Sequence, residues 1–281
     1  MTSLEPAQVA LLAGAALVAG AVNAVAGGGS LISFPALLAV GYPALTANVT
    51  NSVALTPGYF GGTIGYRREL AGQRGRILAL GATSAAGAVV GVVLLLISSQ
   101  ALFERIVPWL IFLACGLLAA QTRLARLVRE RRADPQGLPA QADEPGAGVP
   151  GAGVPEAGGS GADGRTAPLF AAQFLAAAYG AYFGAGVGIM MLAILGIFLA
   201  DNLQRLNALK GLLSFLVSVV AAVSFLLFAD VSLVAVAVMA AASLLGGQLG
   251  VVLARRLNDQ ALRWLVIAFG VAVGLRLLVA G

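Results

Sequence analysis

The residues best suited to ligand binding are uncharged hydrogen-bond donors beside two glycine clusters. The first cluster runs from Gly27 to Gly29, and the second runs from Gly184 to Gly188. A helix that restarts after a glycine break offers free N–H groups and the positive end of its dipole, both of which favour anions. We therefore predict anion binding at the two restarts, Ser30-Leu31 and Gly188-Ile189.

Polar side chains on the helices that follow each cluster are expected to complete the site. Amide and hydroxyl groups bind anionic oxygens without committing a full charge, which allows release as well as binding. Lys210 lies about one turn beyond Asn207 on the same face, and it serves either as an anion ligand or as a snorkelling cytoplasmic anchor. The predicted substrate-binding residues are Asn23, Gly27, Gly28, Gly29, Ser30, Asn48, Thr50, Asn51, Ser52, Gly184, Gly186, Gly188, Asn207 and Lys210.

The chain has few residues for catalysis. It contains no His, and none of its 12 Asp and Glu residues lies in the middle of an apolar segment. An intramembrane acid–base pair, a carboxylate–imidazole metal site and a carboxylate proton relay are therefore not expected. The glycine clusters also lack the context of a dinucleotide loop, and no Walker lysine is present. We expect no enzyme activity, no cofactor and no metal.

The composition indicates a membrane protein. Of the 281 residues, 59% are apolar and only 10% are charged, whereas globular domains carry about 25% charged residues. Apolar stretches of about 18 residues or more, long enough to cross a bilayer, recur along the chain. The net charge of +5 comes from basic residues in short loops, so it reports topology and does not indicate nucleic-acid binding. The single Cys115 excludes an intrachain disulfide framework.

The segments that must position these residues predict an all-α polytopic membrane protein. Apolar segments lie at 7–25, 31–40, 45–65, 76–97, 103–122, 168–183, 187–200, 206–228, 231–253 and 261–279. Segments 31–40 and 187–200 are too short to span comfortably. Each of these two follows a glycine cluster, so each is predicted to be the second arm of a glycine-broken hairpin.

The two clusters belong to two copies of one unit. Ala24–Ile32 aligns with Ala181–Ile189, and Asn51 aligns with Asn207 after one residue of slippage. Each unit is predicted to be a glycine-broken, re-entrant helix pair followed by three transmembrane helices. Glycine-interrupted short segments at matching places in two halves indicate a transporter's binding site. The alternative is that the glycines only allow close helix packing.

The basic residues favour re-entrant hairpins. If each hairpin enters and leaves on one face, all of the 17 Lys and Arg residues except Arg105 and Arg276 share one side, which is then cytoplasmic. Three crossings per unit make the two halves inverted repeats, with both termini outside the cytoplasm. Segment 7–25 is long enough to span by itself, so a full crossing there stays open.

Three parts of the chain are predicted from this pattern. Residues 1–122 form the first membrane repeat, and residues 167–281 form the second. Between them, 123–166 begins as a basic continuation of the preceding helix, from Arg123 to Arg132. From Ala133 onward the connection is rich in Pro, Gly and Ala, which predicts a disordered cytoplasmic linker.

Several stretches resemble the sulfite exporter TauE/SafE family, a group of 4-toluene sulfonate uptake permease-like membrane transporters. They are Ala21–Leu38, Ala47–Leu55, Gly61-Gly62, Gly65–Arg68, Tyr182–Met191 and Asn207–Lys210. The resemblance covers nearly the whole chain apart from the linker. It implies a permease that moves small anions, typically sulfite or organosulfonates, as a secondary transporter and with export as the direction. The implied partners are the lipid bilayer, a small anion, and a coupling proton or cation.

The Ala, Gly and Arg richness indicates a bacterial plasma (inner) membrane. Three other functions stay open: a non-transporting assembly or structural protein of the membrane, a transporter of a non-sulfur organic anion, and a conduit for thiols or sulfur transfer. The lone Cys115 argues against the last of these. The oligomeric state is left open.

Overall fold

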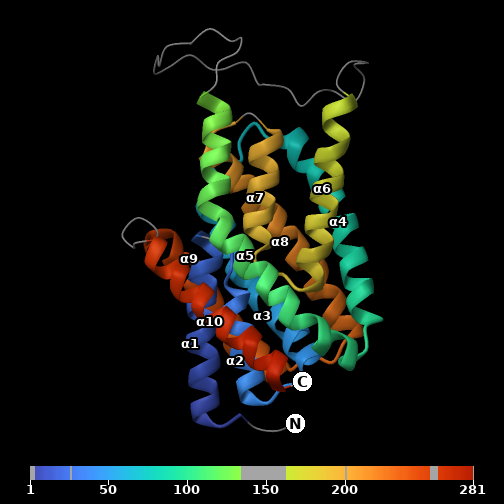
Figure 1. Cartoon of the computed structure of the whole chain (residues 1–281), viewed down its shortest axis with the longest axis vertical. Helices are drawn as coiled ribbons and strands as arrows, with labels where there is room; N and C mark the ends of the chain where they lie inside the picture. Colours follow the sequence, from blue (N-terminus) through green and yellow to red (C-terminus); the bar gives the residue numbers. More distant parts are fainter. Residues whose placement is uncertain (1–3, 26, 134–162, 200, 254–258, 281) are drawn as a thin grey trace.

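The computed structural model describes residues 4–25, 27–133, 163–199, 201–253 and 259–280, and this part of the chain is all-helical. Ten helices follow one another along it (Figure 1). They are α1 (Pro6–Val25), α2 (Ser30–Val40), α3 (Ala44–Gly65), α4 (Arg74–Leu96), α5 (Gln100–Ala133), α6 (Asp163–Tyr182), α7 (Val187–Phe198), α8 (Leu203–Phe228), α9 (Leu233–Leu253) and α10 (Asp259–Ala280).

The predicted helical segments are confirmed. The backbone of α5 stays helical to Ala133, as expected for the basic continuation of that helix. The predicted linker falls largely on 134–162, which lies outside the described residues. Helices α2 and α7 have 11 and 12 residues, so each is no longer than about 18 Å, compared with about 30 Å of hydrocarbon.

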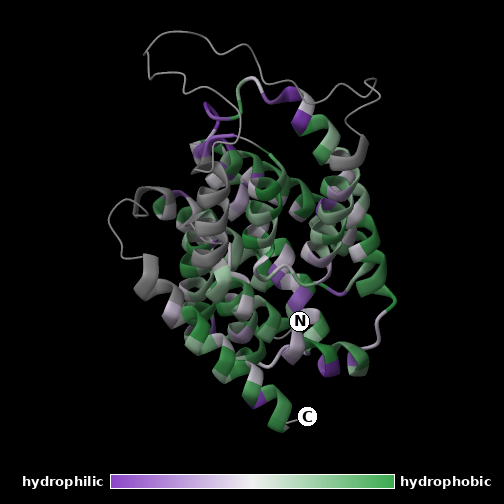
Figure 2. Ribbon diagram, turned by 45° about the horizontal axis from the view of Figure 1, so that its top comes forward, coloured by the Kyte–Doolittle hydropathy of each residue, from purple (hydrophilic) through white to green (hydrophobic). Residues whose placement is uncertain are grey.

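Five of the described helices are long and apolar enough to cross a membrane. The spans are Pro6–Ala24, Arg74–Leu96, Gln100–Ala120, Gln204–Phe228 and Leu233–Gly250. Large apolar side chains, among them those of Leu78, Leu175 and Leu227, are exposed on the outer surface. Such exposure fits contact with lipid. In Figure 2 apolar residues cover most of the helical body, and many of the hydrophilic ones lie toward its ends.

Helices α1 and α2 form one hairpin, and α6 and α7 form another. Along α1, Leu17 lies against Gly246 and Ala21 lies against Gly250, so α1 and α9 run in the same direction. In Figure 1 both chain termini lie at one end of the molecule, near the lower end of α2, whereas α7 extends toward the opposite end. The two hairpins therefore open toward opposite ends.

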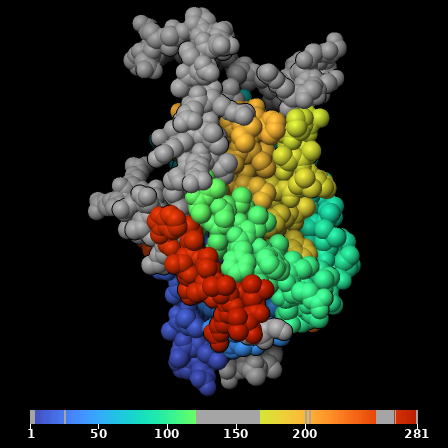
Figure 3. All heavy atoms as spheres, viewed as in Figure 1, coloured from blue at the N-terminus to red at the C-terminus, as the bar shows by residue number. Residues whose placement is uncertain are grey.

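The helices of each half pack largely on those of the other half. Helix α1 packs on α9, as α6 packs on α4, while α3 contacts α8 and α5 contacts α10. In Figure 3, α10 lies between α1 and α5 on the visible face. When α1–α5 is matched in order to α6–α10, the α1–α9 pair corresponds to the α6–α4 pair. The α3–α8 and α5–α10 pairs each correspond to themselves. This pairing is what twofold-related halves produce, and their inverted orientation in a bilayer stays a prediction.

Some glycines serve close packing, as the alternative interpretation anticipated. A Cβ atom on Gly246 would lie 2.0 Å from the carbonyl oxygen of Leu17, and one on Gly91 would lie 2.1 Å from that of Ala178. Backbones can approach this closely only where side chains are absent. These glycines lie in α9 and α4, away from the two hairpin clusters.

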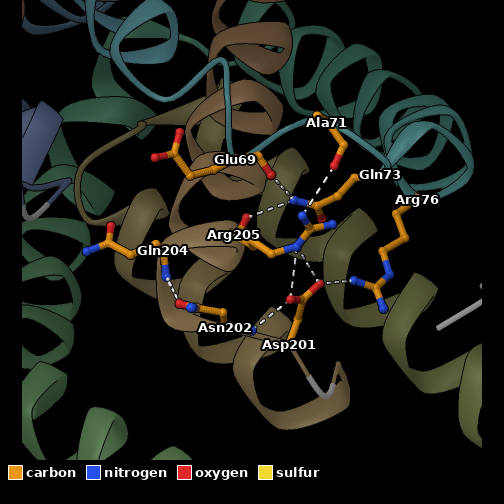
Figure 4. Close-up of polar contacts among 8 residues, drawn as sticks. All are labelled: Glu69, Ala71, Gln73, Arg76, Asp201, Asn202, Gln204 and Arg205. Carbon is orange, nitrogen blue, oxygen red and sulfur yellow. Dashed lines mark hydrogen bonds and ion pairs between the residues drawn. The ribbon is translucent and has the colours of Figure 1, made fainter. Parts of the chain in front are cut away.

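A polar cluster ties the α3–α4 loop to the start of α8 (Figure 4). Asp201 forms ion pairs with Arg76 and with Arg205, whose Nε lies 3.1 Å from Asp201 Oδ1. Arg205 also donates to the carbonyl oxygen of Ala71 at 3.2 Å, and Gln73 donates to that of Arg205 at 3.2 Å. The cluster brings Arg76 and Arg205 to the same carboxylate, and the assignment of their face to the cytoplasm stays a prediction.

Candidate functional site

The two hairpins meet tip to tip through their glycines. Gly27 has a φ of 81° and Gly186 has a φ of 77°, a backbone region that favours glycine. The Gly186 N–H group donates to the Gly27 carbonyl oxygen at 3.1 Å. A Cβ atom on Gly27 would lie 2.9 Å from the Cα atom of Gly188. The contact therefore depends on glycine at both tips.

Asn23 holds the first break in place. It lies in the last turns of α1, is 5% exposed, and its Oδ1 accepts a hydrogen bond of 2.7 Å from the Gly29 N–H group. Its Nδ2 atom is buried and has no hydrogen-bond partner among the described residues. Asn23 therefore caps the broken helix, and its Nδ2 atom keeps both N–H donors without a described acceptor.

A cavity of about 20 Å³ lies beside the hairpin contact, between α3 and α8. This volume holds roughly one water molecule. We call it the lysine cavity, and its lining includes Asn23, Gly27, Tyr59, Gly188, Asn207, Lys210 and Ser214. Five of these residues, Asn23, Gly27, Gly188, Asn207 and Lys210, were predicted from the sequence as substrate ligands.

Lys210 is the notable charge in this cavity. The residue is 5% exposed, which argues against the snorkelling interpretation. Both ion pairs within the described part of the chain involve Asp201, and neither involves Lys210. A buried charge without a partner costs several kcal/mol. The cavity is therefore suited to an anion that would neutralise the ammonium group.

The N–H groups at the helix restarts differ from the prediction. Leu31 N–H donates to the Gly28 carbonyl oxygen at 3.1 Å, and Ile189 N–H donates to that of Gly186 at 3.1 Å. These two groups are not free, because the glycine turns bring local carbonyls within reach. Gly188, which lines the lysine cavity, donates no hydrogen bond to a described residue. Its N–H group is therefore without an acceptor among the described residues.

Other predicted residues hold the two halves together. Asn48 Nδ2 donates to the Tyr182 carbonyl oxygen at 2.8 Å, and Thr50 Oγ1 accepts from the Ser232 N–H group at 3.1 Å. Both side chains belong to α3, and both partners lie in the second half. Neither residue lines the lysine cavity.

Asn51 is 1% exposed, and its buried Oδ1 has no partner among the described residues. It does not line the lysine cavity either.

Three of the predicted glycines pack against other parts of the protein and do not line the lysine cavity. Gly28 lies near Leu118, and a Cβ atom on Gly29 would lie 2.1 Å from the Ala19 carbonyl oxygen. Around Gly186 the nearest atoms belong to Ala114.

A second cavity of about 20 Å³ contains the remaining predicted residues, Ser30, Ser52 and Gly184. We call it the serine cavity, and its lining also includes Tyr59, Gly180, Ser214 and Ser218. Tyr59 and Ser214 line both cavities. Sequence reasoning missed Tyr59, Ser214 and Ser218. Ser214 and Ser218 lie one and two turns beyond Lys210, so helical spacing could have found them.

The chain resembles known membrane proteins. Residues 12–277 match the sequence model of a family described as "Sulfite exporter TauE/SafE". A protein described as "Probable membrane transporter protein ORF9" from Sinorhizobium sp is 35% identical over 103 residues, which are 37% of this chain. The aligned part spans 40% of that relative's length. No solved structure matches.

Proposed function

This chain belongs to the sulfite exporter TauE/SafE family of membrane transporters, and from that premise we propose that it carries a small anion, which binds in the lysine cavity. Its five apolar spans and its family make it a multi-pass bacterial membrane transporter. The single observation that carries the proposal is Lys210, which is 5% exposed, lines the cavity beside the hairpin contact and forms no ion pair with a described residue.

The donors around Lys210 support an oxyanion as the substrate. Asn207 and the unpaired Nδ2 atom of Asn23 add amide donors, and Gly188 adds a backbone N–H group. Charge-assisted hydrogen bonds are about twice as strong as neutral ones, so the ammonium group supplies most of the attraction. Sulfite and organosulfonates fit this donor set, and export is the direction that the family's description supports.

The size of the cavity sets a condition on this mechanism. A space for about one water molecule is too small for a sulfonate, so the hairpin tips or α3 and α8 must separate during transport. The predicted inverted repeat would allow such a motion, because transporters with inverted repeats alternate by moving one repeat against the other around a fixed site. The proposed mechanism is secondary transport, in which movement of the anion is coupled to movement of a proton or another cation.

The test is flux in proteoliposomes loaded with sulfite, sulfoacetate, lactate or chloride. We expect saturable flux of one sulfur oxyanion by the unaltered protein, and its loss in Lys210→Met. Lys210→Arg keeps a cation and should retain part of the flux, while Cys115→Ala serves as a control away from both cavities. Flux that Lys210→Met leaves unchanged would overturn the proposed site. Absence of flux for every anion, from folded and inserted protein, would favour the non-transporting alternative.

A further inference from the structure

The serine cavity occupies the position in the second half that the lysine cavity occupies in the first. In the repeat alignment Gly27 matches Gly184, and Gly58 matches Ser214. Gly27 and Gly58 line the lysine cavity, while Gly184 and Ser214 line the serine cavity. The same holds for the aligned pair of Gly62 and Ser218. The two cavities are therefore counterparts within the repeat.

The counterparts differ in charge. Because Asn51 aligns with Asn207, Ala54 takes the place of Lys210 in the first half. No Lys, Arg, Asp or Glu is among the residues lining the serine cavity. The cation is thus present on one side of the hairpin contact only, and the other side offers hydroxyl groups.

The hydroxyl groups of the serine cavity are poorly satisfied. Ser30, which lines this cavity, is 6% exposed. Ser214 Oγ donates only to the Met191 sulfur, at 3.4 Å, and a thioether is a weak acceptor. Ser52 is an exception, because its Oγ donates to the Asn48 carbonyl oxygen at 2.9 Å. Buried polar groups are normally paired with stronger acceptors, so the Ser214 hydroxyl group keeps hydrogen-bonding capacity for a ligand.

The cavities also follow one another along the seam between α3 and α8, which pack together. The lysine cavity and the serine cavity share Tyr59 and Ser214 as a common wall. A third cavity of about 190 Å³ lies at the start of α3 and the end of α8, lined by Leu45, Val49, Phe228 and Asp230 among others. The order along α3 is thus the lysine cavity, the serine cavity and the third cavity.

We propose that the serine cavity is a second anion subsite, and that the anion moves between it and the lysine cavity past Tyr59 and Ser214. This inference rests on the proposed function. Hydroxyl donors bind an anion more weakly than an ammonium group does. The serine cavity therefore serves passage toward the third cavity, and the lysine cavity serves binding. Unequal affinity at successive sites allows both capture and release.

The experiment compares two double variants. The substrate is whichever of sulfite, sulfoacetate, lactate and chloride the unaltered protein transports. Ser30→Ala/Ser218→Ala removes two hydroxyls from the serine cavity. Ser33→Ala/Ser224→Ala is the matched control, because it removes one hydroxyl from each of the same two helices at positions that line none of the three cavities. Flux is measured in proteoliposomes, and anion affinity is measured calorimetrically on purified protein.

We expect Ser30→Ala/Ser218→Ala to reduce flux by at least about tenfold, since the loss of even one hydrogen bond to a charged group has about that effect, with less than about a twofold change in affinity. The control should leave both quantities unchanged. Flux equal to that of the control would overturn the second subsite. Loss of affinity in Lys210→Met bears on the proposed function alone, so failure of one proposal can be told from failure of the other.

A second measurement tests the proposal if the double variant does not fold. Ser218→Cys, in a Cys115→Ala background, is treated with a sulfonate-bearing methanethiosulfonate reagent. We expect the reagent to block flux, and the transported anion to slow the block. Ser224→Cys is the control and should keep its flux. A modified Ser218→Cys protein with full flux would contradict the passage of the anion through this cavity.

Discussion

The N–H group of Gly186 donates a hydrogen bond of 3.1 Å to the carbonyl oxygen of Gly27, which joins the two hairpin tips through their backbones. The sequence motifs that carry these glycines lie far apart in the chain. Their contact brings a loop from each half to the edge of the lysine cavity, so the first predictions concern the contact and the cavity beside it.

Substitution of Gly27 by Ala should break the hairpin contact. The new Cβ atom would meet the Gly188 Cα atom at 2.9 Å, at a φ of 81°, so we expect a loss of stability of at least about 1 kcal/mol and loss of flux. Thermal unfolding in detergent measures the first effect. Gly116→Ala is the control, because a Cβ atom there meets nothing within 4 Å. Equal melting temperatures for the two variants would contradict the contact.

Lys210→Met should raise the melting temperature while it abolishes flux. Lys210 is 5% exposed and forms no ion pair with a described residue, and replacing such a charged residue by an apolar one relieves its desolvation cost. A lysine kept for structure would give the opposite result, with lower stability in the variant. Thermal unfolding and proteoliposome flux, measured on the same preparation, distinguish the two.

Asn207→Ala and Asn48→Ala should separate binding from assembly. Asn207 lines the lysine cavity, so we expect at least a tenfold loss of flux with stability nearly unchanged. Asn48→Ala leaves the Tyr182 carbonyl oxygen unpaired, which should cost about 1–3 kcal/mol of stability. Asn51→Ala stays predicted to abolish flux without unfolding. Unfolding of Asn207→Ala or of Asn51→Ala would mean that these asparagines are structural.

The stability of the chain should fall at acidic pH through Asp201. Burial opposes its ionisation, but hydrogen bonds from the Asn202 N–H group, Arg76 and Arg205 hold the pKa of its carboxyl below its usual value. A depressed pKa in the folded state gives stability that is present above the ordinary pKa of 3.8 and is lost as pH falls through the folded value.

The melting temperature, measured between pH about 5 and about 3, should therefore drop less steeply in Asp201→Asn than in the unaltered protein. The Asp201→Asn variant should also be less stable than the unaltered protein at neutral pH, because it cannot form the ion pairs with Arg76 and Arg205. Identical pH profiles for the two proteins would mean that the cluster does not contribute.

Cysteine labelling tests the inverted topology. Tyr42 hydrogen-bonds Ser232 at 2.8 Å, in the loops that lie opposite the Asp201 cluster if both hairpins are re-entrant. In a Cys115→Ala background, Pro43→Cys should react with an impermeant maleimide from outside the cell, and Arg68→Cys only from the cytoplasmic side. Labelling of Pro43→Cys from the cytoplasm would contradict the predicted topology.

Much of the helical plan could be read from the sequence, because it depends on local properties. Apolar length predicts α2 and α7 as too short to span, and the runs around Gly27 and Gly184 mark the two breaks. The candidate ligands Asn207 and Lys210 were likewise visible as polar residues in an apolar helix, one turn apart.

Tertiary packing determines which polar residues share a cavity. The rotation of a helix about its axis is set by packing against the other half. Asn48 and Thr50 therefore form hydrogen bonds with residues of the second half. Tyr59, Ser214 and Lys210 instead line the lysine cavity. The positions of the helix breaks, and the donors near them, follow from the amino-acid sequence alone. The burial of Lys210 and the contact of Gly27 with Gly188 came from tertiary packing, because both depend on residues far apart in the chain.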